Sequence, residues 1–297
     1  MRIALIVIIA AGCELACGLL LAQAASAPLG RPAASYEVKG PEEKGGLETY
    51  VVTSDYQEKP CPLYVLLPDK FDKTKRYKVL YILPALGPGD KEGVLEAKKR
   101  DLGNKFNVIC VGPDFCSMPW YVDNPEKPRI RYDSYLPDVI VPFIDKTYPT
   151  TPEPEGRLLV GFSKSGMGAV SLLLRHPDVF GRAGSWDGCL MADNRPEFYG
   201  SKENFAKYYI PNLLAERAEM LRDKPARIAV MGYFYMKRDA DAARKLMEQL
   251  KIPHYFDNSV KREHEWPSGW LAPLVEVLMA DDMVKAKPVL TPASGAK

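Results

Sequence analysis

Residues 158–169 place one serine where a nucleophile would be exposed. Ser163 follows a short apolar run and precedes a helical pattern, and small residues surround it at Gly161, Ser165 and Gly166. Small residues let a strand and a helix approach closely, so that the turn between them lifts the hydroxyl above a sheet. The spacing is G-x-S-x-S-G, with serine where a second glycine is usual. We therefore predict that Ser163 is a nucleophile; the alternative is a helix N-cap in an ordinary glycine-rich turn.

Strands and helices alternate around this turn, as a parallel sheet with right-handed crossovers requires. Short, mostly apolar runs predict strands at 48–53, 63–67, 78–83, 107–111, 158–160, 183–187, 228–231 and 253–257. Helical spacing predicts a helix after Ser163 and others at 91–102, 133–148, 209–221, 239–250 and 270–283, with a kink at Pro142. The expected fold class is α/β, with a mostly parallel central sheet covered by helices on both faces.

Several of these segments resemble the esterase-D-like family of α/β-hydrolases. The matching segments are 113–114, 120–121, 132–135, 136–148 and 161–169, and the similarity extends from about residue 48 to residue 278. The family includes S-formylglutathione hydrolases, tributyrin-type acetyl esterases, feruloyl esterase domains and mycolyltransferases. The resemblance implies an α/β-hydrolase fold, a serine nucleophile and ester substrates, and it leaves the ester unnamed.

In a hydrolase of this type, two backbone amides stabilise the oxyanion of the reaction. The loop after strand 78–83 would supply one of them, from Ala85 or Leu86, unless it is a plain strand-to-helix turn; Lys164 would supply the other. A long loop after strand 107–111 carries Trp120 and Tyr121. We expect these two aromatic residues to contact the substrate, because loops at the ends of parallel strands hold ligands in α/β proteins.

The general base is sought among three histidines. His176 stands at the family's recurrent His-Pro position after the helix that follows Ser163, and His254 lies inside the last strand, so structural roles are expected for both. His264 falls between the last strand and the last helix, where this fold delivers its histidine, and it resembles the family's His-x-Trp segment. His264 is therefore the predicted base, against a surface histidine in a charged loop.

The acid that orients the histidine is harder to assign. The family's usual G-x-x-D register begins here at Gly232 and ends on Tyr235, which carries no charge. Asp187 follows the preceding strand, at the edge of the sheet where His264 is expected. Asp239 is the alternative acid, although it also reads as the N-cap of the next helix. We predict Asp187, because triads are recognised by geometry and not by position.

Composition narrows the possible partners. The chain has 297 residues, 46% hydrophobic and 26% charged, with a net charge of +2. These values are typical of a globular domain and favour neither nucleic acid nor an acidic surface. No cofactor is expected. The predicted partner is a small-molecule or saccharide-linked ester.

The N-terminal residues read as a signal peptide. Arg2 precedes an apolar stretch and an alanine-rich end at 22–27, so residues 1–26 are expected to be removed and the protein to be secreted or periplasmic, with no stable membrane insertion afterwards. Neither Cys13 nor Cys17 follows a convincing lipobox, so a lipoprotein is not favoured. The remaining boundaries are a poorly ordered lead-in at 27–46, a catalytic domain at 47–284 and a flexible tail at 285–297.

Four cysteines lie beyond the signal peptide: Cys61, Cys110, Cys116 and Cys189. An exported protein would allow disulfides among them in any of about three full connectivities, and buried free thiols are the alternative. Neither cysteines nor histidines have metal-site spacing, so no metal is expected.

Together these residues predict a secreted serine carboxylic ester hydrolase that forms an acyl-enzyme on Ser163 with His264 and Asp187. Two alternatives remain at this point. One is acyl transfer at the same site, and the other is a catalytically degenerate hydrolase that acts as a binding module.

Overall fold

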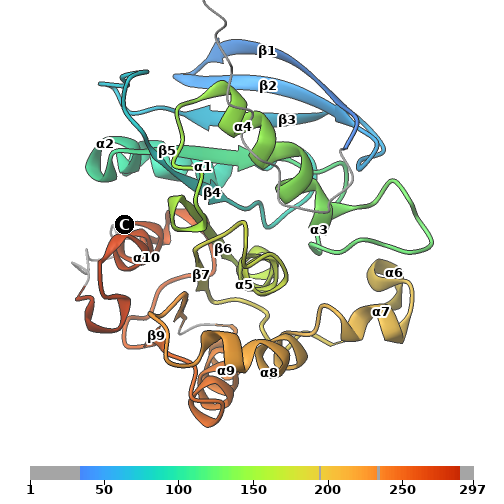
Figure 1. The fold of residues 1–297 in the computed structure, drawn as a ribbon, viewed down its shortest axis with the longest axis vertical. Helices are drawn as coiled ribbons and strands as arrows, with labels where there is room; N and C mark the ends of the chain where they lie inside the picture. Colours follow the sequence, from blue (N-terminus) through green and yellow to red (C-terminus); the bar gives the residue numbers. More distant parts are fainter. Residues whose placement is uncertain (1–33, 194, 233–234, 288–297) are drawn as a thin grey trace, which may run out of the picture.

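The computed structural model describes residues 34–193, 195–232 and 235–287. Within these residues the strands form one nine-stranded sheet in the order β1-β2-β3-β5-β4-β6-β7-β8-β9 (Figure 1). The strands are β1 (Tyr36–Lys44), β2 (Leu47–Ser54), β3 (Cys61–Leu66), β4 (Lys78–Ile82), β5 (Val108–Pro113), β6 (Arg157–Phe162), β7 (Arg182–Trp186), β8 (Ile228–Met231) and β9 (His254–Asp257). The pairs from β1 to β5 in this order are antiparallel and all the others are parallel. The predicted fold class is confirmed.

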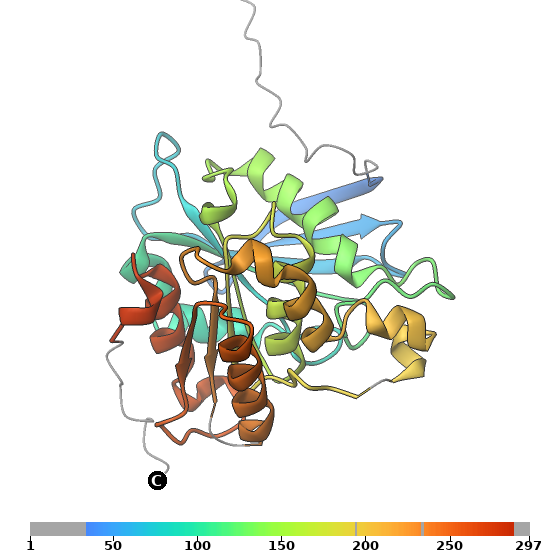
Figure 2. The same cartoon turned by 60° about the horizontal axis from the view of Figure 1, so that its bottom comes forward.

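Helices cover both faces of the sheet, as Figures 1 and 2 show. One face packs against α1 (Glu92–Lys99), α2 (Leu102–Phe106) and α10 (Leu271–Met279). The other packs against α3 (Tyr132–Tyr135), η1 (Leu136–Ile140), α4 (Val141–Thr147), α5 (Lys164–Arg175), α8 (Ile210–Leu221) and α9 (Lys237–Gln249). Successive side chains of a strand point to opposite faces, so Leu80 of β4 joins one buried cluster and its neighbour Tyr81 joins the other.

Five short elements complete the described chain: η2 (Pro154–Gly156), α6 (Pro196–Tyr199), α7 (Lys202–Ala206), η3 (Trp266–Ser268) and η4 (Met283–Lys285). Figure 1 shows α6 and α7 to one side of the sheet, beyond α8. None of the helices in the described ranges is long and apolar enough to span a bilayer.

The predicted lead-in at 27–46 is wrong over its second half, where β1 forms an edge strand paired with β2. Most side chains of β1 are exposed, so the strand depends on backbone pairing, and its apolar alternation is limited to Tyr36 and Val38. The sheet therefore begins before the expected domain start at residue 47. The predicted signal peptide, residues 27–33 and residues 288–297 of the predicted tail lie outside the described residues.

The predicted helix at 133–148 forms as one uninterrupted helical run made of α3, η1 and α4. The segment η1 is a π-helical turn between the two α-helices, and Pro142 lies in the first turn of α4. The proline lacks an N–H to donate to the preceding turn, which favours an irregular turn there. The helix predicted at 91–102 is divided, since Asp101 takes a left-handed conformation between α1 and α2. The remaining strands and helices agree with prediction apart from shifts at their ends.

Candidate active site

Ser163 occupies the turn between β6 and α5 in a strained backbone conformation, with φ 55° and ψ −126°. Its N–H donates to the carbonyl of Trp186 on β7 (3.1 Å), and its own carbonyl accepts the N–H of Cys189 (3.1 Å). A non-glycine residue at positive φ costs on the order of 1–3 kcal/mol and persists where its surroundings enforce it. The neighbouring strand and loop thus hold Ser163 in the sharp turn that the sequence predicts.

The small residues around Ser163 explain the unusual spacing. A Cβ atom at Gly161 would collide with the backbone of Ser165, and one at Gly166 would lie 2.6 Å from the hydroxyl of Ser185. Ser165 is buried; its hydroxyl accepts the N–H of Phe162 (3.0 Å) and donates to the carbonyl of the same residue (2.9 Å). Serine fits where glycine is usual because its hydroxyl satisfies polar groups at the end of the strand.

His264 and Asp187 form the central polar pair of the site. The His264 Nδ1 atom lies 2.7 Å from Oδ2 of Asp187, whose side chain is completely buried. The Asp187 carboxylate also accepts the N–H groups of Tyr235 (3.0 Å) and Met236 (2.9 Å). Asp187 follows β7 directly, and its own N–H donates to the carbonyl of Met231 on β8 (2.7 Å). Asp187 therefore presents a fixed acceptor to one ring nitrogen of His264.

The imidazole of His264 packs beside the nucleophile turn. Its ring contacts Phe162 edge-on at a centroid distance of 5.1 Å and Tyr235 at 5.3 Å. The hydroxyl of Ser163 lies 3.9 Å from Sγ of Cys189 and makes no hydrogen bond to His264. Because Nδ1 is engaged by Asp187, Nε2 is the nitrogen left for a serine proton. Hydrogen bonds of this kind are often long before substrate binds, so the serine must turn from Cys189 toward Nε2.

Asp239, the alternative acid, has a different role. Its carboxylate accepts the N–H of Met191 (3.0 Å), in the loop beyond β7. The N-cap of α9 is Met236, and Asp239 stands in the first helical turn. The predicted capping role is wrong, and the described contacts join Asp239 to the Met191 loop instead of to His264.

The two amides predicted after β4 already have an acceptor. Ala85 and Leu86 donate their N–H groups to Oδ2 of Asp90, at 3.0 and 2.9 Å. Another N–H in this turn, that of Gly89, donates to Oδ2 of Asp114 at 2.7 Å. Burial raises the pKa of the Asp114 carboxyl, and the charge of Asp90 raises it further. An oxyanion at these amides would have to displace the Asp90 carboxylate.

The two aromatic residues predicted to contact the substrate have different surroundings. The expectation for Tyr121 is wrong: its ring is buried against Gly168, and its hydroxyl donates to the carbonyl of Pro84 (2.6 Å). Trp120 lies stacked on Phe198 at 5.0 Å and lines a cavity of about 100 Å³. Trp120 can meet a ligand, whereas Tyr121 supports the loop after β4 from below.

The other histidines are structural, as expected. His176 Nε2 lies 3.0 Å from Oδ1 of Asp133, and His254 Nδ1 lies 2.8 Å from the carbonyl of Ile252. Within the described ranges, no group of three or more His, Cys, Asp or Glu side chains is arranged to hold a metal ion.

Residues 54–225, more than half of the chain, match the model of the family named Esterase. The chain belongs to this esterase family. Among curated proteins, Esterase Rv1288 of Mycobacterium tuberculosis is 31% identical over 130 residues, which are 42% of this chain and 28% of that protein. The matched region thus spans little more than a quarter of the relative.

Solved structures give the same fold for the esterase. A ferulic acid esterase superposes with a TM-score of 0.61 at 18% identity, covering 78% of this chain and 92% of the other. An S-formylglutathione hydrolase from Agrobacterium tumefaciens superposes with a TM-score of 0.62 at 14% identity, covering 77% of this chain and 92% of the other. MPT51 of Mycobacterium tuberculosis superposes with a TM-score of 0.57 at 18% identity, covering 84% of this chain and 98% of the other. These matches confirm the α/β-hydrolase fold and the family resemblance.

In this esterase Ser163 follows β6, Asp187 follows β7, and the loop after β9 brings His264 to the same carboxyl edge of the sheet. Sequence reasoning missed two residues here, Cys189 and Asp90. Asp90 had a faint signal as a polar residue at the end of a Pro- and Gly-rich turn. Cys189 had none beyond its place two residues after Asp187.

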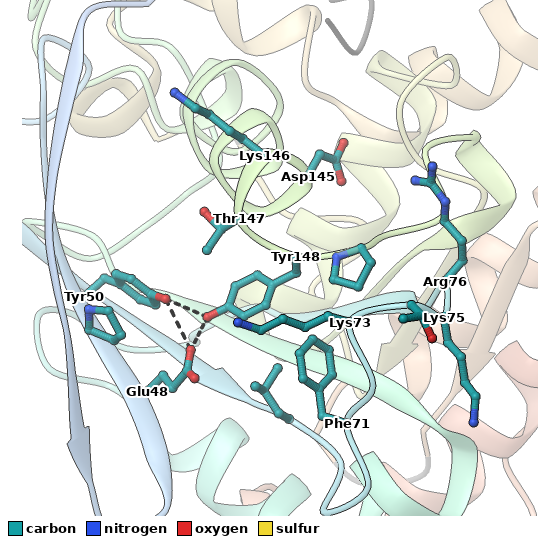
Figure 3. Close-up of a pocket in the computed structure, with 14 residues that line it drawn as sticks. Glu48, Tyr50, Phe71, Lys73, Lys75, Arg76, Asp145, Lys146, Thr147 and Tyr148 are labelled. Atoms are coloured by element: carbon teal, nitrogen blue, oxygen red, sulfur yellow. Dashed lines mark hydrogen bonds between the residues drawn. The ribbon is translucent and has the colours of Figure 1, made fainter. Parts of the chain in front are cut away.

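A groove of about 730 Å³ lies elsewhere (Figure 3). It is lined by Arg76, just before β4, and by Tyr148 and Pro149, before β6. In it the hydroxyls of Tyr50 and Tyr148 bond to each other (2.8 Å) and to Glu48. The amino ends of β4 and β6 form the sheet edge opposite Ser163, so this groove is not part of the active site.

Proposed function

We propose that this esterase-family chain is a secreted serine carboxylic ester hydrolase in which Ser163 is the nucleophile, His264 the base and Asp187 the acid. The observation that carries the proposal is the 2.7 Å contact between His264 and a fully buried Asp187, beside the strained Ser163 turn. A carboxylate bonded to one imidazole nitrogen fixes the tautomer and stabilises the imidazolium that forms when serine attacks.

The proposed reaction has two halves. The Ser163 oxygen attacks the ester carbonyl carbon while its proton moves to Nε2 of His264, and the alcohol then leaves with that proton. Water attacks the acyl-enzyme in the second half, again giving a proton to His264, and the acid product leaves as Ser163 regains its hydrogen. The substrate class is a small-molecule or saccharide-linked ester.

Two amides would stabilise the oxyanion in this proposal: the N–H of Lys164, first in α5, and that of Leu86, with Ala85 beside it. Each such donor contributes on the order of 3 kcal/mol to barrier lowering. The Asp90 carboxylate that accepts the Ala85 and Leu86 amides has to release them during turnover. The N-terminus of a helix also favours developing negative charge.

Export is part of the proposal and rests on the composition of residues 1–26. Its test is N-terminal sequencing of the protein recovered from the producing cell's exterior or periplasm. The expected first residue follows a cleavage near Ala24 or Ser26; an intact Met1 in a cytosolic fraction contradicts export and leaves the catalytic proposal standing.

The catalytic proposal is tested with 4-nitrophenyl acetate and a fluorophosphonate label. We expect hydrolysis by the protein, loss of hydrolysis in Ser163→Ala, and a label found by peptide mass spectrometry on Ser163 alone. Label at another residue, or none in a folded sample, contradicts it. Lys146→Gln, an exposed change on the opposite groove (Figure 3), is the control that should keep full activity.

A further inference from the structure

Two cations lie over one aromatic ring beside the proposed nucleophile. The Lys164 ammonium is 5.8 Å from the ring centroid of Trp120, and the Arg195 guanidinium carbon is 5.2 Å from it. Phe198 stacks against the same indole at 5.0 Å. Contacts of this kind hold a cation in place without neutralising its charge. The side chain of Lys164 comes from the start of α5, that of Trp120 from the loop after β5, and that of Arg195 from the loop before α6.

The positive charge of Lys164 acts on groups around the proposed active site. Lys164 follows Ser163 directly, and its charge interacts with Cys189, whose sulfur contacts the Ser163 hydroxyl at 3.9 Å. It also interacts with Asp90, the acceptor of the predicted oxyanion amides. The Lys164 charge therefore acts on both Cys189 and Asp90.

The positive charge here is poorly compensated. Among the described carboxylates, none forms an ion pair with Lys164 or Arg195, and Asp90 is bonded to two backbone amides instead. Burial lowers the pKa of the Lys164 ammonium, and the charge of Arg195 lowers it further. Both cations lie near the Trp120 ring, and Lys164 is also the first residue of α5. An anion bound beside this ring would be attracted by the two cations and by the helix N-terminus.

Trp120 adds an unused hydrogen-bond donor. Its indole N–H is buried and finds no acceptor among the residues that the structure describes. A buried donor normally has a partner, so this one points to an acceptor outside the described part of the chain.

We propose that Lys164, Arg195 and Trp120 form a subsite for a carboxylate carried by the ester substrate. The subsite rests on the proposed ester hydrolysis at Ser163, and it narrows the substrate class to anionic esters. Arg195 supplies a planar pair of donors that matches a carboxylate, and Lys164 supplies a point charge. The charge can sit on either the acyl or the alcohol part of the ester.

Matched pairs of esters test the subsite. For the alcohol side, 4-acetoxybenzoate is compared with 4-acetoxybenzamide; for the acyl side, the 4-nitrophenyl monoester of glutaric acid is compared with that of glutaramic acid. Within each pair the molecules differ only in carboxylate against carboxamide. We expect kcat/KM to favour the anionic member of at least one pair about tenfold, the size of one charge-assisted hydrogen bond. Added salt should reduce the preference, because Arg195 is exposed.

Three variants test which residues produce the preference for the anionic ester. Arg195→Gln and Lys164→Met should each reduce the ratio of anionic to neutral kcat/KM about fivefold or more, mainly through KM of the anionic ester. Lys146→Gln removes a cation from the opposite groove and should leave the ratio unchanged. Equal rates within both pairs for the wild-type protein overturn the proposal, as does a preference that survives in Arg195→Gln and Lys164→Met together.

Binding measurements test the carboxylate subsite independently of the proposed ester hydrolysis. Calorimetry of Ser163→Ala with the same esters reports affinity without turnover, and the anionic ester should bind about tenfold tighter than its amide partner. Tighter binding of the anion with no turnover of any ester by the wild-type protein would contradict the hydrolase and keep the subsite. Turnover of all the esters with no anion preference would contradict the subsite and keep the hydrolase.

Discussion

The Nδ1 atom of His264 lies 2.7 Å from Oδ2 of Asp187 although the two residues are 77 positions apart in the chain. The contact forms because Asp187 directly follows β7, which pairs with β8, and the loop after β9 returns His264 to the same edge of the sheet. Two backbone N–H groups, from Tyr235 and Met236, hold the carboxylate on its other sides. A carboxylate with three donors is fixed in direction, so the imidazole ring it contacts is fixed as well.

Asp187→Asn should therefore reduce turnover of 4-nitrophenyl acetate on the order of 10⁴-fold, the loss seen when a triad acid becomes an amide. Stability should fall by about 1–3 kcal/mol, because one buried N–H loses its charged acceptor. Asp239→Asn is the matched control: it weakens only the bond to Met191 and should keep activity within a few fold. Steady-state rates on samples verified as folded by circular dichroism check both; comparable losses in the two variants would refute the role of Asp187.

Ser163→Gly should be more stable than Ser163→Ala. The backbone at this position has φ 55° and ψ −126°, which alanine cannot adopt without strain and glycine can. The gain should be about 1 kcal/mol, since relief of strain is partly offset by the greater entropy of an unfolded glycine. Urea unfolding of the two variants measures it, and both should be inactive. Equal stabilities would mean that the turn is not strained in solution.

The parts of the fold that were predictable are those where both faces of a strand are buried. Val79, Leu80 and Tyr81 form a continuous apolar run because the two helical layers each require an apolar side chain from it. β1 offers no such signal, since it is an edge strand whose side chains are mostly exposed. The π-helical turn inside the helix at 133–148 could not be predicted, because the sequence shows only the proline that follows it.

The residues of the candidate site were also predictable only in part. Ser163 and His264 follow from local spacing and chain order, and Asp187 from the rule that neighbouring parallel strands end at one edge. Asp90 gave only a faint signal, and Cys189 and Arg195 were missed, because their partners come from loop conformations that periodicity does not describe. The prediction that Tyr121 contacts the substrate was wrong for a physical reason. An aromatic side chain in a loop can as readily fill the core as face a ligand.

Cys61 and Cys116 should form a disulfide when oxidised glutathione is supplied. Their sulfurs lie 3.0 Å apart, and both cysteines are free in the structure. A hydrogen bond from the Cys61 thiol, with another from the N–H of Lys59, lowers the pKa of Cys116 to about 7. Above that pH the thiolate of Cys116 attacks the glutathione disulfide and releases one glutathione; Cys61 then displaces the second, so two thiols are oxidised as one disulfide is reduced.

Mass spectrometry should show a loss of about 2 Da and a linked peptide pair, with the rate rising as the pH increases through about 7. The bridge closes a loop of 55 positions and should add up to about 4 kcal/mol of stability. Cys61→Ser is the control, which should retain glutathione on Cys116. A free-thiol count that stays constant in the wild-type protein would contradict the prediction.

Asp133 should make the fold sensitive to acid. Its buried carboxylate accepts Nε of Arg175 (2.9 Å) and lies 3.0 Å from Nε2 of His176. Burial alone would raise the pKa of Asp133, but the charges and hydrogen bonds of His176 and Arg175 outweigh it and lower the pKa below its ordinary value. A carboxyl whose pKa is lower in the folded state than in the unfolded chain stabilises the fold above the unfolded pKa, and this contribution disappears as the pH falls through the folded value.

Urea unfolding of the wild-type protein should therefore give a free energy of unfolding that falls between about pH 5 and pH 3, where unfolded aspartates take up protons. Asp133→Asn should lose about 3 kcal/mol near pH 7, because Arg175 is left partly buried without its partner, and should lose less than the wild type on acidification. Asp55→Asn, which changes an exposed carboxylate, controls for the general effect of removing a negative charge. If Asp133→Asn and Asp55→Asn show the same acid dependence as the wild type, the Asp133 pair does not govern acid stability.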